Sequence, residues 1–126
     1  MLRTIAGMLS PAGRKALLSI VIFHRVLAQR DPVLDWDLDA REFEQRLRWL
    51  RSWFNILPLD EAVIRLEQQS LPARAAAVTF DDGYADNFTV ALPILKRLGV
   101  SATFFIATGY LDGGRMWNDT ISHSVR

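Results

Sequence analysis

Residues 75–84, AAAVTFDDGY, join an apolar run to an acidic turn. An apolar run ends at Phe80, and two carboxylates, Asp81 and Asp82, follow it directly. A short continuous apolar run bounded by turn residues predicts a strand. Gly83 permits a tight turn that would point both acidic side chains into one site at the end of the strand. We therefore expect a strand at 75–80 with a pair of carboxylates at its carboxyl end.

Strand and helix patterns alternate on the amino-terminal side of this segment. Residues 17–23, LLSIVIF, predict a strand covered on both faces, and residues 27–38 predict a loop. A helix is expected over about 40–54, because Asp39 and Glu42 form a capping-box pattern in front of apolar residues at helical spacing. These apolar residues are Phe43, Leu47, Leu50 and Phe54.

Two more elements are expected before the acidic pair. Residues 55–57 predict a brief strand, and Asp60 is expected to cap a helix near 61–69. The inward-facing positions of this helix are expected to be Ala62, Val63 and Leu66.

The alternation continues after the acidic pair. Residues 92–98 predict a helix with Pro93 in its first turn and Gly99 as its stop, and residues 102–107 predict a further strand. Loops are expected at 81–87 and 109–114. This order of elements predicts a parallel sheet with covering helices, either open or closed into a barrel. Functional residues of such folds lie after the carboxyl ends of the strands, where His24 is also expected.

The composition fits one domain or part of one. The chain has 126 residues, of which 50% are hydrophobic and 23% charged, and this balance excludes wholesale disorder. The formal net charge of +1 gives no general attraction to nucleic acid. Because the chain has no cysteine, thiolate catalysis, cysteine-ligated zinc and disulfides are excluded.

The amino terminus predicts a leader over residues 1–16, followed by the domain at 17–126. The apolar stretch at 16–23 has the length of a buried strand and is too short for a membrane span, which needs roughly 18 residues or more. We therefore expect no transmembrane segment and identify no export signal in this stretch.

Asp81 and Asp82 are the first candidates for chemistry. Two adjacent carboxylates behind an apolar strand repel each other and lose hydration, which costs stability unless a cation or a proton intervenes. A divalent metal bound by Asp82 would resolve this repulsion, with Asp81 free to accept a proton from water. The structural alternative is that one aspartate caps a turn and the other is solvated.

The stretch TFDDGYADN at 79–87 resembles the first signature motif of the polysaccharide deacetylases, also called the NodB-homology or carbohydrate esterase family 4 proteins. Three other stretches are also similar to this family, and together they span about residues 17–115. They are FHRV at 23–26, LRWLRSWFNILPLDEAV at 47–63 and ALPILKRLGVSATFFIATGYL at 91–111.

The resemblance implies a distorted (β/α) barrel of the NodB deacetylase type that removes N-acetyl groups from an N-acetylated polysaccharide. Carried over by position, Asp81 is the catalytic base and Asp82 is a metal ligand. The implied metal is divalent, commonly zinc, and two His residues four apart complete its site in the family. The family resemblance also implies the cell envelope or secretion, with the cytoplasm as the alternative.

The sequence departs from the family pattern in its last third. It contains no His-x-x-x-His pair: His123 could open one, but the partner would fall at position 127, beyond Arg126. His123 is thus either a metal ligand or an exposed residue near the end of the chain. We expect a domain truncated after about four β/α units, with the remaining His ligands beyond Arg126 and no activity of residues 1–126 alone.

Two further side chains are candidates for the substrate side. His24 either orients Asp81 or contacts the substrate, or else it is a hydrogen-bonded structural residue. Trp117 is a weaker candidate for stacking on a sugar.

Two other functions remain as alternatives. The first is a non-catalytic carbohydrate-binding relic of the deacetylase family that has lost its metal site. The second is a phosphotransfer domain, which the sequence disfavours because the strand at 102–107 ends without an acceptor aspartate and no lysine ends a late strand.

Overall fold

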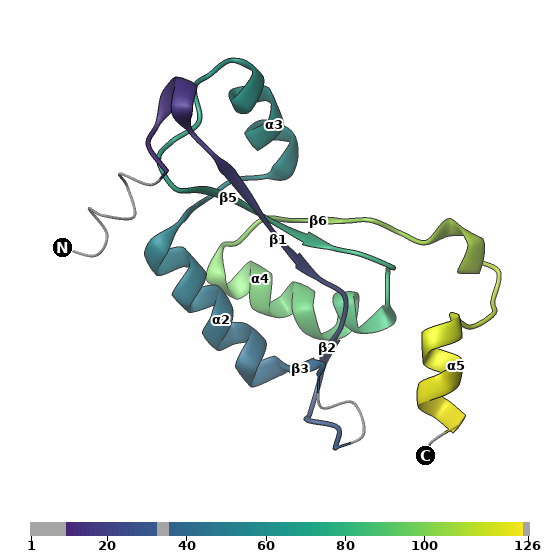
Figure 1. The fold of residues 1–126 in the computed structure, drawn as a ribbon. Helices are drawn as coiled ribbons and strands as arrows, with labels where there is room; N and C mark the ends of the chain where they lie inside the picture. The colour runs from purple at the N-terminus through teal and green to yellow at the C-terminus, as the bar shows by residue number, and fades with distance from the viewer. Residues whose placement is uncertain (1–9, 33–35, 125–126) are drawn as a thin grey trace.

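A four-stranded parallel sheet is the centre of the computed structural model, which describes residues 10–32 and 36–124 (Figure 1). Its strands are β1 (Leu18–Phe23), β4 (Asn55–Ile56), β5 (Ala75–Phe80) and β6 (Ala102–Phe104). Strand β5 is central: β1 pairs with its full length on one side, while β4 and β6 pair with its two ends on the other. All these pairings are parallel, which confirms the predicted class of sheet.

The helices α2 (Ala40–Trp53) and α4 (Leu92–Leu98) lie together on one side of this sheet (Figure 1). Helix α3 (Leu59–Glu67) packs against the amino-terminal end of β5, and α5 (Trp117–Ser124) ends the described chain. None of the helices in the described part of the chain has the length and apolar content needed to cross a bilayer.

Aromatic rings fill the core between the sheet and the two helices. Phe23 and Phe80, which are partners in the β1–β5 register, have ring centroids 5.4 Å apart, and both pack on Phe43 of α2 at 5.1 and 5.7 Å. Phe104 of β6 stacks on Phe80 at 4.9 Å. Because Phe23, Phe80 and Phe104 are the last residues of β1, β5 and β6, their packing in the core fixes where the residues after each strand lie.

Most elements lie where the sequence predicts them. The helix expected over 40–54 is α2, and its capping box is present, since Glu42 N–H donates to Asp39 Oδ1 over 2.8 Å. Gly99 ends α4 in the left-handed conformation, with φ 62°, as a C′ glycine should.

Residues directly before β1 contact the same end of the sheet. Gly13 N–H donates to Leu71 O over 2.8 Å, Arg74 N–H donates to Ser10 O over 3.0 Å, and Ala16 is buried. Residues 1–9 of the expected leader lie outside the described residues, so the division at residue 16 stays a prediction.

The prediction for α3 is partly wrong. The helix begins at Leu59 behind Pro58, and Asp60 lies in its first turn, not at its N-cap. Only Ala62 is buried, against Leu71 and Ala75, whereas the expected inward residues Val63 and Leu66 are exposed. The reason is that, in the described part of the chain, α3 contributes only Ala62 to the buried cluster at this end of the sheet.

The helix around Pro93 is longer than predicted. Residues 85–86 are already helical, and the π-helix η2 (Asn87–Ala91) runs directly into α4. Pro93 cannot donate a backbone hydrogen bond and would crowd the preceding turn of a regular α-helix. A wider π-turn in front of the proline relieves this crowding, so that the helix continues past it.

Three further predictions are wrong in detail. The expected loop at 27–38 is bordered by two short parallel strands, β2 (Val26–Leu27) and β3 (Leu38–Asp39). Strand β6 ends at Phe104 instead of residue 107, and the 3-10 helix η3 (Thr108–Tyr110) lies partly within the loop expected at 109–114. Such two- or three-residue elements follow from tertiary contacts and have no periodic signal in the sequence.

Candidate functional site

The turn after β5 is held between the ends of the two neighbouring strands. Asp81 N–H donates to Phe23 O at the end of β1 over 2.9 Å. On the other side, Phe105 N–H donates to Phe80 O over 2.8 Å. The acidic pair thus begins at the carboxyl edge of the sheet, where the sequence predicts it.

Asp82 and Gly83 make the turn with two consecutive left-handed residues. Their φ angles are 73° and 71°. Glycine adopts this conformation without cost, and a Cβ at Gly83 would lie only 2.8 Å from Ile106 Cδ1. A residue with a Cβ pays roughly 1–2 kcal/mol there, although aspartate tolerates it better than most. The left-handed conformation that places the Asp82 side chain is therefore also a source of backbone strain.

His24 is brought to Asp82 by the parallel pairing of β1 with β5. It follows the last residue of β1, and its Nδ1 lies 3.1 Å from Asp82 Oδ2. An ionised carboxylate only accepts hydrogen bonds, so the tautomer of His24 with a proton on Nδ1 is the one that can donate to it. The structure therefore places His24, Asp81 and Asp82 at one edge of the sheet, and joins His24 to Asp82, not to Asp81.

Arg25 forms a second cluster directly beside this edge. Its Nε and Nη2 lie 3.0 and 2.9 Å from Asp86 Oδ2, and its guanidinium carbon is 4.7 Å from the centre of the Tyr84 ring. Burial alone would lower the pKa of Arg25, but the hydrogen bond and charge of Asp86 raise it above its ordinary value. Arg25 is thus a fixed cation that ties the end of β1 to the helix behind the acidic turn.

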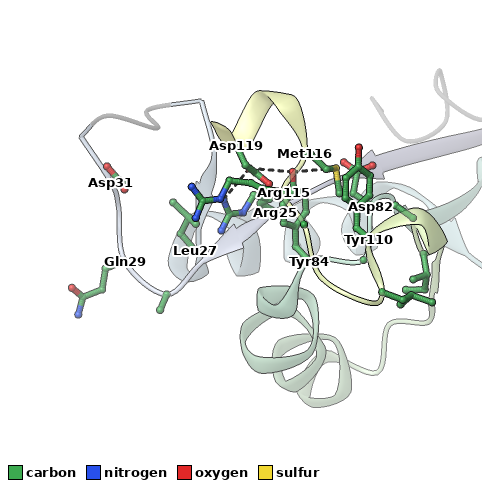
Figure 2. A pocket seen from close by; sticks show the side chains of 16 residues that line it. Arg25, Leu27, Gln29, Asp31, Asp82, Tyr84, Tyr110, Arg115, Met116 and Asp119 are labelled. Carbon is green, nitrogen blue, oxygen red and sulfur yellow. Dashed lines mark hydrogen bonds and ion pairs between the residues drawn. The ribbon is translucent and has the colours of Figure 1, made fainter. Parts of the chain in front are cut away.

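The same cluster docks the last helix. Asp119 of α5 accepts a hydrogen bond from the Tyr84 hydroxyl over 3.3 Å, and its Oδ1 lies 3.8 Å from Arg25 Nη1 (Figure 2). Burial raises the pKa of Asp37 above its ordinary value, and the charges of Asp86 and Asp119 add to this rise against the opposing effect of Arg25. The carboxylates of Asp37, Asp86 and Asp119 therefore all interact electrostatically with the guanidinium of Arg25.

Sequence reasoning missed this second cluster. The available signals were that Arg25 directly follows His24 and that Asp86 comes four residues after Asp82. Neither spacing predicts the contact, because residues 25 and 86 meet only through the pairing of β1 with β5.

A cleft of about 700 Å³ opens between the acidic turn and α5. Asp82 lines it together with Arg25, Tyr84 and Asp119 (Figure 2). Asp81 and His24 are not among the residues that line it, so Asp82 is the member of the predicted site that faces this cleft.

The described residues supply part of a metal site. Asp82 and His24 offer one carboxylate and one imidazole at the same point. Among the side chains that the structure describes, however, no three of His, Cys, Asp or Glu gather closely enough to hold a metal ion. The side chains of His123 and Trp117 in α5 lie outside the described residues, so their predicted roles stay predictions. A catalytic zinc ordinarily has three protein ligands, and the donors described here fit such a site only in part.

Comparison with known proteins gives consistent relatives. The polysaccharide deacetylase family matches residues 68–123. A Bacillus subtilis protein named as a polysaccharide deacetylase is 33% identical over 95 residues, which cover 74% of this chain and 33% of that protein. A Staphylococcus aureus poly-beta-1,6-N-acetyl-D-glucosamine N-deacetylase is 30% identical over 80 residues, or 63% of this chain and 28% of that protein.

A solved structure matches as well. IcaB from Ammonifex degensii superimposes with a TM-score of 0.63 at 29% identity, over 77% of this chain and 39% of that one. The α/β arrangement of parallel strands described above is therefore shared with a solved relative. The chain spans about a third of the length of the curated relatives it matches.

Proposed function

We propose, on the premise that this chain is a member of the polysaccharide deacetylase family, that it contributes the acidic half of a hydrolytic site that removes N-acetyl groups from a polysaccharide. The observation that carries this proposal is the placement of the Asp81–Asp82 turn at the carboxyl edge of the sheet, with His24 3.1 Å from Asp82. The matched region at 68–123 contains this turn.

Asp81 is proposed as the general base and Asp82 as a metal ligand. Asp82 presents its carboxylate to both the cleft and His24, which supports a binding role. Asp81 is half-buried and anchored through its backbone N–H, and no hydrogen bond between its carboxylate and another described residue occupies it. A positioned carboxylate of this kind can accept a proton from an attacking water. A divalent metal, when bound, would supply Lewis-acid activation of that water and of the amide carbonyl.

His24 is proposed to orient Asp82. A hydrogen bond from an imidazole fixes which oxygen of a carboxylate faces a ligand, and such outer contacts tune metal sites. The exposure of the imidazole also leaves it within reach of a substrate at the sheet edge.

The metal site proposed here is completed from outside the described residues. Zinc is the expected metal, with Asp82 as one ligand and His residues as the others. His123 is a candidate only if a second His follows it, which would require residues beyond Arg126.

The fold proposed is part of a distorted barrel of the NodB type. Helices α2 and α4 cover one face of the sheet, while Ile20 and Ile22 of β1 remain exposed on the other side of the strand. The matched part of this chain covers 33% and 28% of the two relatives, which supports a barrel that needs further β/α units.

Acetate release tests this function. The longest form of the protein that the gene encodes should release acetate from an N-acetylglucosamine polymer, lose this activity on chelation and regain it with zinc. Residues 1–126 alone should release none, because the described side chains bring no three metal ligands together. A longest form that binds zinc but releases no acetate from any N-acetylated polysaccharide would refute the proposal.

A non-catalytic relic is the second candidate, and the lack of a three-donor group among the described residues favours it. Zinc titration separates the two candidates. A relic would bind zinc no better than its Asp82→Ala variant does, whereas the enzyme would bind it far more tightly.

A further inference from the structure

The cleft beside Asp82 has an apolar part that the acidic site does not explain. Ile106, Tyr110 and Leu111 line it, and they are 49%, 44% and 68% exposed. Single exposed apolar residues are ordinary, but neighbours gathered in one cleft indicate a binding surface.

The remaining part of the cleft is polar and charged. Asp31, Arg115 and Asp119 also line it. Figure 2 shows Asp31 at the left-hand end of the cleft, with Tyr110 and Asp82 both at the right-hand end. Arg115 is exposed and forms no ion pair with any residue that the structure describes. The cleft therefore offers an apolar surface and hydrogen-bonding groups to the same ligand.

Backbone hydrogen bonds hold Tyr110 in a defined position relative to Asp82. Ala107 N–H donates to Asp82 O over 3.4 Å, and Tyr110 N–H donates to Ala107 O over 3.1 Å. Gly113 N–H then donates to Tyr110 O over 3.3 Å. Tyr110 is thus part of a turn that is joined directly to the acidic turn.

Tyr110 is 44% exposed, so the described fold covers its side chain only in part. It forms no ring–ring contact with another described aromatic residue, and Gly114, which lies against it, has no side chain to cover it. An aromatic ring that lies open to the cleft on a hydrogen-bonded turn is placed where a flat apolar ligand can stack on it.

We propose that Tyr110 is a sugar-stacking residue, on which a hexosamine unit of the polymer lies as the chain passes Asp82. A pyranose ring has an apolar face of C–H groups and a rim of hydroxyls, so it matches a cleft with an apolar part and a polar part. This inference rests on the proposed function, which supplies the polysaccharide, and it adds the residue that holds the sugar.

Calorimetric titration with a tetramer of N-acetylglucosamine tests the proposal. The longest form of the protein is used with Asp81→Asn present, so that turnover does not consume the ligand. Tyr110→Ala should raise Kd about tenfold, the loss expected for one aromatic contact, while Tyr110→Phe should stay within about twofold. Trp49→Ala is the matched control, because Trp49 is an aromatic residue of α2 that is 58% exposed and does not line the cleft.

Leu111→Ala gives a second variant at a more exposed position, for which a loss of about threefold is expected. Equal Kd values for Tyr110→Ala and its parent would overturn the proposal, as would an equal loss in Trp49→Ala or no binding of the tetramer at all. A large fall in melting temperature in Tyr110→Ala would also overturn it, because the ring would then pack against another part of the protein.

The turnover assay keeps the two proposals apart. With Asp81 intact, Tyr110→Ala should raise KM and leave kcat nearly unchanged. If the tetramer still binds through Tyr110 but no acetate is released, the deacetylase assignment fails and the stacking residue stands. If acetate is released with an unchanged KM in Tyr110→Ala, only the stacking residue fails.

Discussion

Replacing Asp82 by glycine and by alanine separates the cost of its backbone from the function of its carboxylate. Both variants lose the side chain that contacts His24. Only alanine keeps a Cβ at a position with φ 73°. Both variants should therefore lose the metal ligand proposed at residue 82, and they should differ from each other in their free energy of unfolding.

The expected difference follows from two opposing effects. The left-handed conformation costs a residue with a Cβ roughly 1–2 kcal/mol and costs glycine nothing. Glycine also increases the conformational entropy of the unfolded chain, which lowers the free energy of unfolding by roughly 0.4–1 kcal/mol relative to alanine. Asp82→Gly should therefore exceed Asp82→Ala by about 1 kcal/mol in the free energy of unfolding, or about 4 °C in melting temperature.

Urea unfolding of both variants, followed by far-ultraviolet circular dichroism, measures this difference. Asp82→Asn is the matched control, because asparagine tolerates the left-handed region as aspartate does. Its stability should lie close to that of the parent, since an exposed His–Asp contact contributes little. If Asp82→Ala were as stable as Asp82→Gly, the turn would not hold residue 82 in the left-handed region, and the account of how its carboxylate is aimed would be wrong.

Three other perturbations have definite expected outcomes. Asp39→Ala removes the capping box of α2 and should lower the free energy of unfolding by about 1 kcal/mol in urea. Arg25→Ala leaves the half-buried Asp86 without its cation and should cost about 2 kcal/mol, whereas Arg48→Ala, at an exposed ion pair, should change stability by less than about 0.5 kcal/mol. The pKa of Asp37 is raised in the folded protein above its ordinary 3.8, so its contribution to stability is full below pH 3.8 and is lost as the pH rises through the folded pKa. Asp37→Asn should accordingly reduce the loss of stability between pH 4 and pH 7, and an unchanged pH profile would contradict the raised pKa.

Local patterns were sufficient to predict the sheet and its main helix. The spacing of Phe43, Leu47 and Leu50 predicted the buried face of α2, and these residues are buried against the sheet. The apolar run before Asp81 predicted β5, which is buried at every position. Both signals come from burial over several residues, which a sequence records directly.

The parts that the sequence did not predict depend on contacts between distant residues. The exposure of Val63 follows from how little of the described chain covers α3, and no spacing within the helix records this. The Arg25–Asp86 ion pair joins residues that meet only through strand pairing. Tyr110 was not singled out because a tyrosine in a glycine-rich loop has no local pattern. It lines the cleft because the chain at residues 106–111 lies beside the acidic turn, where Ala107 N–H donates to Asp82 O.

Metal content measured together with acetate release distinguishes the roles proposed for the two aspartates. In the longest form of the protein, Asp81→Asn should keep its zinc and lose roughly 10²–10⁴-fold in turnover, because only the base is removed. Asp82→Asn should lose both zinc and turnover. An Asp81→Asn protein that kept its zinc and deacetylated an N-acetylglucosamine oligomer at nearly the parent rate would contradict the account.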